Sequence, residues 1–112
     1  IDCGRIINPD GVTNQAEGGI VQAISWTLKE QVRFDRTRIT SRDWESYPIL
    51  TFADVPTIET VLLDRPDEAW LGVGEGMVGP TAAAIANAVC NAMGVRVRDM
   101  PIARERILAA MG

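Results

Sequence analysis

The chain has no histidine, and its only cysteines are Cys3 and Cys90. Without histidine, neither a Ser-His-Asp nor a Cys-His catalytic arrangement can be assembled within these residues, and a histidine-bearing zinc site is excluded. Two cysteines are also too few for an iron–sulfur cluster, which takes four thiolates. The two are distant in sequence and have small or apolar neighbours, so we expect both to be free and buried.

The chain also lacks an excess of basic residues and any long apolar run. Its formal net charge is −4 at pH 7, whereas nucleic-acid-binding proteins usually carry a basic patch or stripe. The longest apolar run, Ala82 to Cys90, is broken by Asn87 and is too short to span a membrane. We therefore expect neither nucleic acid as a partner nor a membrane span. No signal peptide is present, but the first residue is Ile1 rather than methionine, which suggests a segment of a longer protein.

A glycine-rich loop, residues 71–80, is the most informative stretch that is present. It places one carboxylate, Glu75, among four glycines within eight residues. Glycine permits positive φ angles and a close approach to the backbone, but each one costs conformational entropy on folding. We interpret the loop as one that holds Glu75 against something bulky and flat, with a helix beginning behind it. The simpler alternative is a flexible surface loop whose glutamate is merely solvated.

The same loop also matches a dinucleotide-binding fingerprint. Gly74-x-Gly76-x-x-Gly79 has the required spacing, and Asp99 follows at about the distance where a ribose-binding acid belongs. However, no β-branched run precedes the loop, and Glu75 would bring negative charge towards a pyrophosphate. Few residues follow Asp99, too few for the remaining strands of such a fold. Nucleotide binding is therefore the weaker hypothesis.

The first predicted helix covers residues 14–28. Asn14 fits an N-cap with Glu17 as its capping-box partner. Apolar residues then recur at helical spacing, at Ala16, Ile20, Ala23, Ile24 and Leu28. The Gly18-Gly19 pair costs about 1 kcal/mol per glycine relative to alanine. A glycine pair early in a helix indicates close packing against another backbone or a ligand.

Two further helices are predicted nearer the end of the chain. Pro80 suits the first helical position, and residues 81–93 are apolar almost all round. Such a helix should be buried on nearly every side, which requires a larger body than this chain. Gly94 is the expected stop. The last predicted helix begins at Pro101 and ends at Ala110.

Alternating and β-branched residues predict short strands, and an Asn8 to Gly11 turn is expected after the first of them. The strands cover residues 1–7, 31–35, 38–40, 57–64 and 95–98. The predicted fold class is therefore α+β, with two layers in which short, mostly antiparallel strands pack with about three helices. We expect residues 1–112 to form a single domain with a modest core.

Two groups of side chains are candidates for contact with a ligand or partner. Gln15 is expected in the first turn of the first helix, where free N–H groups point outward, although it could be a solvated polar residue. Trp44, Tyr47 and Phe52 lie in a long irregular connection. They suit either a partner contact or a local core.

Several motifs, taken in order and at their spacings, carry a resemblance to one family. The chain resembles the C-terminal segment of the molybdenum-binding large subunit of the xanthine oxidase/aldehyde oxidase family. Residues 43–50 are most similar to the bacterial isoquinoline 1-oxidoreductase type. The motifs are Asp2-Cys3-Gly4, Asn8-Pro9, Gln15-Ala16-Glu17-Gly18-Gly19, Tyr47-Pro48, Gly72-Val73-Gly74-Glu75 and Gly79-Pro80-Thr81-Ala82-Ala83-Ala84.

This resemblance implies a cofactor and roles for three residues. Glu75 would be the general base beside the molybdenum, and Gln15 would hydrogen-bond the pterin, with Gly74 in the same pocket. The cofactor would be molybdopterin in its cytosine dinucleotide form, which holds the metal through its dithiolene, so no protein ligand to the metal is implied. Gly76-Met77-Val78, after the glutamate, departs from several relatives, which leaves the substrate open.

The resemblance also implies an enzyme with more than one part. The substrate would be an N-heteroaromatic compound or an aldehyde, hydroxylated with oxygen from water. The expected partners are the rest of the molybdenum-binding subunit and a small subunit carrying iron–sulfur clusters. We expect the isolated segment to be inactive, to expose a wide apolar patch and to self-associate. The alternative is a non-catalytic assembly domain of an inactive relative.

Overall fold

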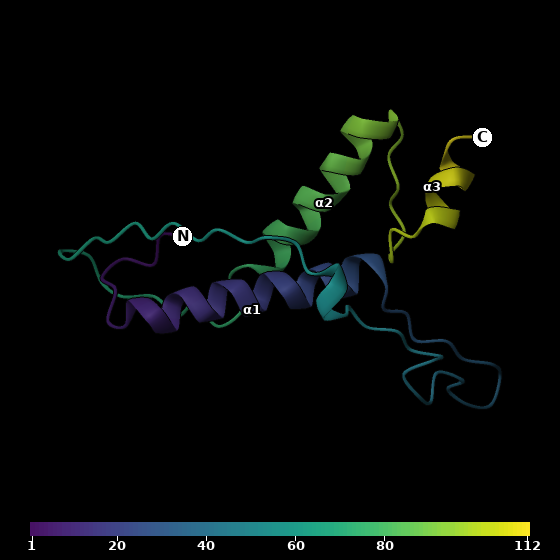
Figure 1. The fold of residues 1–112 in the computed structure, drawn as a ribbon, viewed down its shortest axis with the longest axis horizontal. Helices are drawn as coiled ribbons and strands as arrows, with labels where there is room; N and C mark the ends of the chain where they lie inside the picture. The colour runs from purple at the N-terminus through teal and green to yellow at the C-terminus, as the bar shows by residue number, and fades with distance from the viewer.

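Three α-helices joined by long extended segments make up the molecule. The computed structural model describes residues 1–112. The helices are α1 (Pro9–Leu28), α2 (Val78–Met93) and α3 (Arg104–Ala110), with a single 3-10 turn, η1 (Phe52–Asp54). Figure 1 shows α2 rising from the middle of α1, with α3 standing apart from α2 at the end of a long connection. The chain contains no β-strand, so the prediction of a two-layer α+β fold is wrong.

The predicted strands reduce to two isolated bridges. Asp2 pairs with Leu63 in parallel, and Phe34 pairs with Ile39 in an antiparallel hairpin. Residues 57–64 are extended as predicted, but their backbone meets only the chain start, where Leu63 N–H donates to Ile1 O at 2.9 Å. Alternation in sequence reports a preference for extended backbone, whereas a strand also needs a partner ladder. Residues 57–64 form no continuous ladder with another segment of the chain, and residues 95–98 likewise form none.

Helix α1 begins earlier than predicted because Asn8 is its N-cap. The Asn8 side chain accepts a hydrogen bond from Gly11 N–H at 3.0 Å, and Pro9 occupies the first helical position. The Asn-Pro-Asp-Gly sequence is therefore a helix start, although the same residue types are typical of turns. Asn14 lies inside the helix, where its amide donates to Asp10 O at 2.9 Å, so its prediction as the N-cap is wrong.

Helix α2 ends where the sequence predicts but is not buried. Gly94 adopts a left-handed φ of 73°, and its N–H donates to Cys90 O at 2.9 Å, which confirms it as the stop. The helix begins at Val78, two residues before Pro80, and contains no buried residue. The predicted burial required a larger body than this chain, and within the chain the helix stays uncovered. Helix α3 begins at Arg104 rather than at Pro101.

The core is small and is built around α1. Only 11 of 112 residues are buried, and six of them belong to α1: Val12, Ala16, Ala23, Ile24, Ser25 and Thr27. The accessible surface is 8129 Å², against about 6,000 Å² for a compact monomer of this mass. The radius of gyration is 17.1 Å, against about 13 Å for a compact domain of this length. Much apolar surface therefore remains exposed, as expected for this segment.

The structure also shows the state of the two cysteines and the character of the helices. Both cysteines are free as predicted, but only Cys3 is buried, while Cys90 is partly exposed. None of the helices combines the length and apolar character needed to cross a membrane.

Candidate functional site

The glycine loop is open on one side. Its start is fixed by Leu71 N–H, which donates to Cys3 O at 2.9 Å. A Cβ added at Gly72, Gly76 or Gly79 would meet no atom within 4 Å. None of the loop glycines has a positive φ, so left-handed backbone is not the reason for them. Free space beside the backbone is therefore the feature that these glycines share.

Glu75 stands on this open loop without a partner. The residue is exposed. The three ion pairs of the chain join Lys29 to Asp54, Arg38 to Asp35 and Arg65 to Asp2, and none of them includes Glu75. The carboxylate is thus neither enclosed in an apolar interior nor neutralised by a neighbouring cation. It can face a group that approaches the loop from outside.

The fold brings Gln15 to the same loop. The Gln15 side-chain amide nitrogen lies 4.0 Å from the position that a Cβ on Gly74 would take. Gln15 is in the second turn of α1 because that helix begins at Pro9. The expectation that it sits among the free N–H groups of the first turn is therefore wrong. Its exposed amide still lies beside the backbone that carries Glu75.

A surface cavity of about 310 Å³ adjoins Gln15 and the start of the glycine loop. Its lining combines the start of α1 with residues before and within the loop: Cys3, Arg5, Ile7, Asn8, Gly11, Val12, Gln15, Trp70, Leu71, Gly72 and Val73. Arg5 is held by its Nε–H, which donates to Pro66 O at 2.7 Å. Glu75 is not among the residues that line the cavity.

Gly4 allows the chain start to approach the segment before the loop closely, and the Asp2-Cys3-Gly4 motif was the only hint of it in the sequence. Its φ is 71°, a left-handed conformation that favours glycine. A Cβ at Gly4 would collide with the carbonyl oxygen of Ala69. The chain start therefore lies directly against the segment that leads into the loop. Arg5 and Trp70, which line the cavity, were not singled out by sequence reasoning.

The three aromatic candidates do not form a local core. Trp44 is 74% exposed and Phe52 is fully exposed. Tyr47 is partly buried, and its hydroxyl donates to Glu30 Oε2 at 2.7 Å. That hydrogen bond raises the pKa of Tyr47. Trp44 and Tyr47 also line an apolar hollow of about 550 Å³ against one side of α1.

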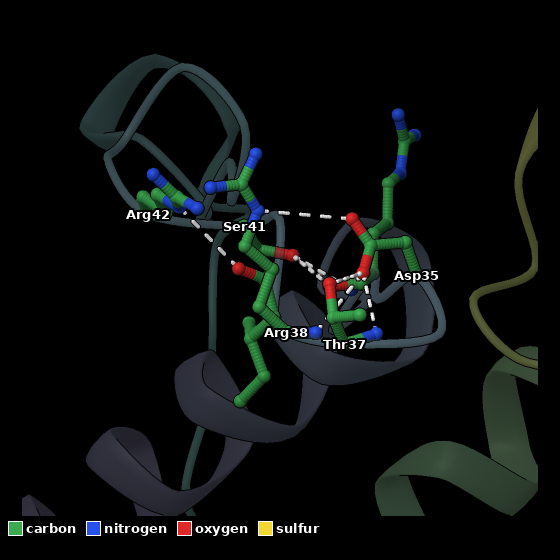
Figure 2. Close-up of polar contacts among 7 residues, drawn as sticks. Asp35, Thr37, Arg38, Ser41 and Arg42 are labelled. Carbon is green, nitrogen blue, oxygen red and sulfur yellow. Dashed lines mark hydrogen bonds and ion pairs between the residues drawn. The ribbon is translucent and has the colours of Figure 1, made fainter.

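A second group of polar side chains lies in the turn at residues 35–42, and its contacts are local (Figure 2). One Asp35 carboxylate oxygen accepts hydrogen bonds from the Thr37 N–H at 2.7 Å and from the Thr37 hydroxyl at 2.8 Å. It also accepts one from the Arg38 N–H at 3.0 Å. The Thr37 bonds lower the pKa of Asp35. This cluster stabilises a turn and leaves no free group for chemistry.

The glycine loop lacks the context of a dinucleotide site. No strand precedes Gly74, and the chain contains no sheet against which a fingerprint helix could pack. The fingerprint requires that strand–turn–helix context. The spacing of Gly74, Gly76 and Gly79 is therefore coincidental with respect to nucleotide binding.

The residues present fit a cofactor that brings its own metal ligands. No group of three or more histidine, cysteine, aspartate or glutamate side chains could hold a metal ion. The chain offers instead an unpaired carboxylate, an exposed amide and an open glycine edge. An amide can donate and accept hydrogen bonds, which suits the edge of a pterin ring. Together these features suit contact with a bulky polar group that brings its own metal ligands.

Comparison with known proteins identifies the family of the chain. The family model described as molybdopterin cofactor-binding domain matches residues 1–56, half of the 112 residues, and the chain belongs to that family. Gln15 lies within the matched residues and Glu75 lies beyond them.

Individual relatives agree with this assignment. The chain is 46% identical over 111 residues to a nicotinate dehydrogenase subunit of Pseudomonas putida, covering 99% of this chain and 9% of that one. It is 33% identical over 102 residues to the beta subunit of isoquinoline 1-oxidoreductase from Brevundimonas diminuta, covering 91% and 13% respectively. The crystal structure of quinoline 2-oxidoreductase from Pseudomonas putida 86 superposes with a TM-score of 0.80 at 34% identity, covering 98% of this chain and 15% of that one. The chain thus spans less than a sixth of each relative.

Proposed function

We propose that this chain contributes the catalytic base, Glu75, and part of the molybdopterin pocket to a molybdenum hydroxylase. The observation that carries the proposal is the unpaired Glu75 carboxylate on an open glycine loop, with the Gln15 amide beside Gly74. Membership of the molybdopterin cofactor-binding family supports it.

In this proposal the two side chains have separate tasks. When bound, the cofactor supplies the metal centre that accepts electrons from the substrate and activates water. Glu75 takes the proton from the water-derived oxygen that enters the substrate. A positioned general base of this kind contributes about 10²–10⁴-fold in rate, provided that it lies within hydrogen-bond reach of the proton. Gln15, whose amide lies beside Gly74, would hydrogen-bond the pterin.

The substrate class proposed is an N-heteroaromatic compound, with an aldehyde as the other option. Three relatives are named for nicotinate, isoquinoline and quinoline, which are all N-heteroaromatic. A further relative, at 37% identity, is named an aldehyde oxidoreductase molybdenum-binding subunit. An electron-poor ring carbon next to nitrogen, or an aldehyde carbon, is the position that a water-derived oxygen would attack.

The proposed partners are the rest of the molybdenum-binding subunit and a small iron–sulfur subunit. Helix α2 supports the first of these, because it has neither a charged nor a buried residue, and uncovered apolar surface suits an interaction site. The cytosine dinucleotide form of the cofactor belongs to the same proposal.

The test is Glu75→Gln in the complete enzyme, with turnover expressed per bound molybdenum. The amide keeps the size of the side chain but cannot take a proton, so we expect turnover to fall by about 10²–10⁴-fold at full metal content. Glu59→Gln is the matched control, because Glu59 is also exposed and lies on the extended segment away from the loop. Near-normal turnover of the Glu75 variant with cofactor fully loaded would remove Glu75 from its proposed role.

A second candidate function is favoured by the same apolar surface. Helix α2 contains no charged residue and no buried residue, which suits a domain that serves assembly alone. The complete protein would then bind no molybdenum after expression with an adequate supply of the metal. Stoichiometric molybdenum, measured by elemental analysis, would exclude this candidate.

A further inference from the structure

The glycine loop touches α1 at two points that lie one helical turn apart. Gln15 faces Gly74, as described above, and Gly19 faces Met77. A Cβ built on Gly19 would lie 3.4 Å from Met77 Cβ and 3.9 Å from Met77 Cγ. Residues four apart on a helix share one face, so both contacts lie on the same side of α1. Glu75 lies between the two contact points along the loop and is exposed.

The two glycines of the Gly18-Gly19 pair differ in what surrounds them. A Cβ at Gly18 would meet nothing within 4 Å, whereas one at Gly19 would be in contact with Met77. Alanine therefore fits at Gly19 with an ordinary van der Waals contact, whereas a longer side chain there adds atoms beside Met77. The sequence indicated close packing of the pair, and the structure assigns that packing to Gly19 alone.

Met77 joins three parts of the molecule. Its side chain lies over Gly19 of α1, and its carbonyl accepts the Thr81 N–H at 3.1 Å as the cap of α2. The Glu75 carbonyl accepts the Val78 N–H at 3.3 Å. Between Gly72 and Gly76 the loop has few side chains that could fix it, and glycine backbone has the greatest conformational freedom. Met77 is the first larger side chain after Glu75 that is packed against another element.

We propose that the packing of the Met77 side chain against Gly19 is the positioning contact that holds Glu75 in place for catalysis. Met77 and Gly19 are positioning residues, because they act through Glu75, and the inference rests on the proposed role of Glu75 as the base. A displacement of about 1 Å at a catalytic group can cost about 10²-fold in rate. The contact between Met77 and Gly19 attaches the loop to α1, which the glycines of the loop cannot do themselves.

The experiment compares Gly19→Leu with Gly18→Leu in the complete molybdenum enzyme. Both substitutions add the same side chain to neighbouring positions of one helix, but only leucine at 19 is built against Met77. We expect Gly19→Leu to lower kcat per bound molybdenum by about 10- to 100-fold, with Gly18→Leu and Gly19→Ala within about twofold of the unsubstituted enzyme. Equal losses at positions 18 and 19 would overturn the inference.

Two combined variants show whether the effect passes through Met77 and Glu75. Met77→Ala and Gly19→Leu remove the same contact, so the double variant should lose about as much kcat as the worse of the two single variants, and not the product of their losses. In the Glu75→Gln enzyme, Gly19→Leu should change the slow remaining turnover by less than about twofold, because the base is already absent. Losses that multiply in the double variant, or an undiminished loss in the Glu75→Gln background, would contradict positioning.

The same experiments separate failure of this inference from failure of the proposed function. Loss of turnover in Glu75→Gln together with equal behaviour of the two leucine variants would overturn only the positioning role. Retained turnover in Glu75→Gln would overturn the proposed function itself. If Gly19→Leu does not load molybdenum, Met77→Ala alone decides: a loss of about tenfold in kcat at full metal content supports the inference, and an unchanged kcat overturns it.

Discussion

Helices α1 and α2 differ in a way that their composition does not suggest. Helix α2 is the more apolar and contains no charged residue, yet none of its residues is buried. Helix α1 contains Asp10 and Glu17 and nevertheless provides six of the eleven buried residues. The reason is the number of neighbours, because the chain start, the glycine loop and Ile102 all contact α1. Burial follows from what packs against a helix, and hydrophobicity only makes that packing favourable.

Placing the same substitution in each helix should give the largest difference in the loss of stability. Ala16 of α1 is 1% exposed, while Ala88 of α2 is exposed. Ala16→Asp places an unpaired charge in the core and should lower the free energy of unfolding by about 3 kcal/mol or more. Ala88→Asp should cost less than about 1 kcal/mol, mainly through helix propensity. Urea unfolding followed by circular dichroism measures both, and similar losses would remove the distinction between the helices.

A second prediction concerns the uncovered surface of α2. The 112-residue chain should self-associate as its concentration rises, because a wide apolar surface favours contact between copies. Val89→Arg with Met93→Arg adds charge to α2 and should shift the apparent mass towards that of a monomer. The charge-matched control is Asn14→Arg with Gln22→Arg, at two exposed neutral residues of α1. Light scattering that finds a clean monomer at high concentration for the unsubstituted chain would count against this prediction.

The smallest predicted effect is on the pH dependence of stability, through an ion pair at the C-terminal end of α1. Lys29 Nζ donates to Asp54 Oδ2 at 2.5 Å, which ties the end of the helix to η1. This bond, with further ones from Thr51, lowers the pKa of Asp54 from 3.8 to about 2. Because the pKa is lower in the folded chain, the contribution to stability is complete above about pH 4 and is lost as the pH falls towards about 2.

Thermal unfolding between about pH 5 and about pH 2 measures this contribution. The Tm of Asp54→Asn should fall less over that range than the Tm of the unsubstituted chain. Asp67→Asn, at an exposed residue of the loop approach, is the control and should keep the original slope. Identical slopes for all three chains would show that the Lys29–Asp54 pair contributes nothing measurable.

The helices were the predictable part of the fold because their signals are local. Gly94 stops α2 through its own backbone conformation, and the apolar spacing along α1 needs no distant partner. The start of α1 was misplaced because Asn8 and Asn14 are both good caps, and only Asn8 has a following proline. The strands were wrong because a ladder depends on a second segment that these residues do not supply to positions 57–64.

The candidate site divides in a similar way. Glu75, Gln15 and Gly74 were named from their motifs, and the structure brings Gln15 to Gly74, while their roles in catalysis and cofactor binding stay predictions. The contact of Met77 with Gly19 could not be read from the sequence, because it joins two elements that are distant along the chain. The Gly18-Gly19 pair was the only sign of this contact in the sequence, and the pair does not indicate which of the two glycines makes it.

The most direct test of the central claim is the first half-reaction without an electron acceptor. In the complete enzyme, substrate is mixed anaerobically with excess oxidised protein, and the rate of metal-centre reduction is followed by its visible absorbance. The account predicts that Glu75→Gln slows this rate by about 10²-fold or more, while Glu59→Gln leaves it unchanged. Equal rates for the two variants, at equal molybdenum content, would contradict the claim that Glu75 is the base.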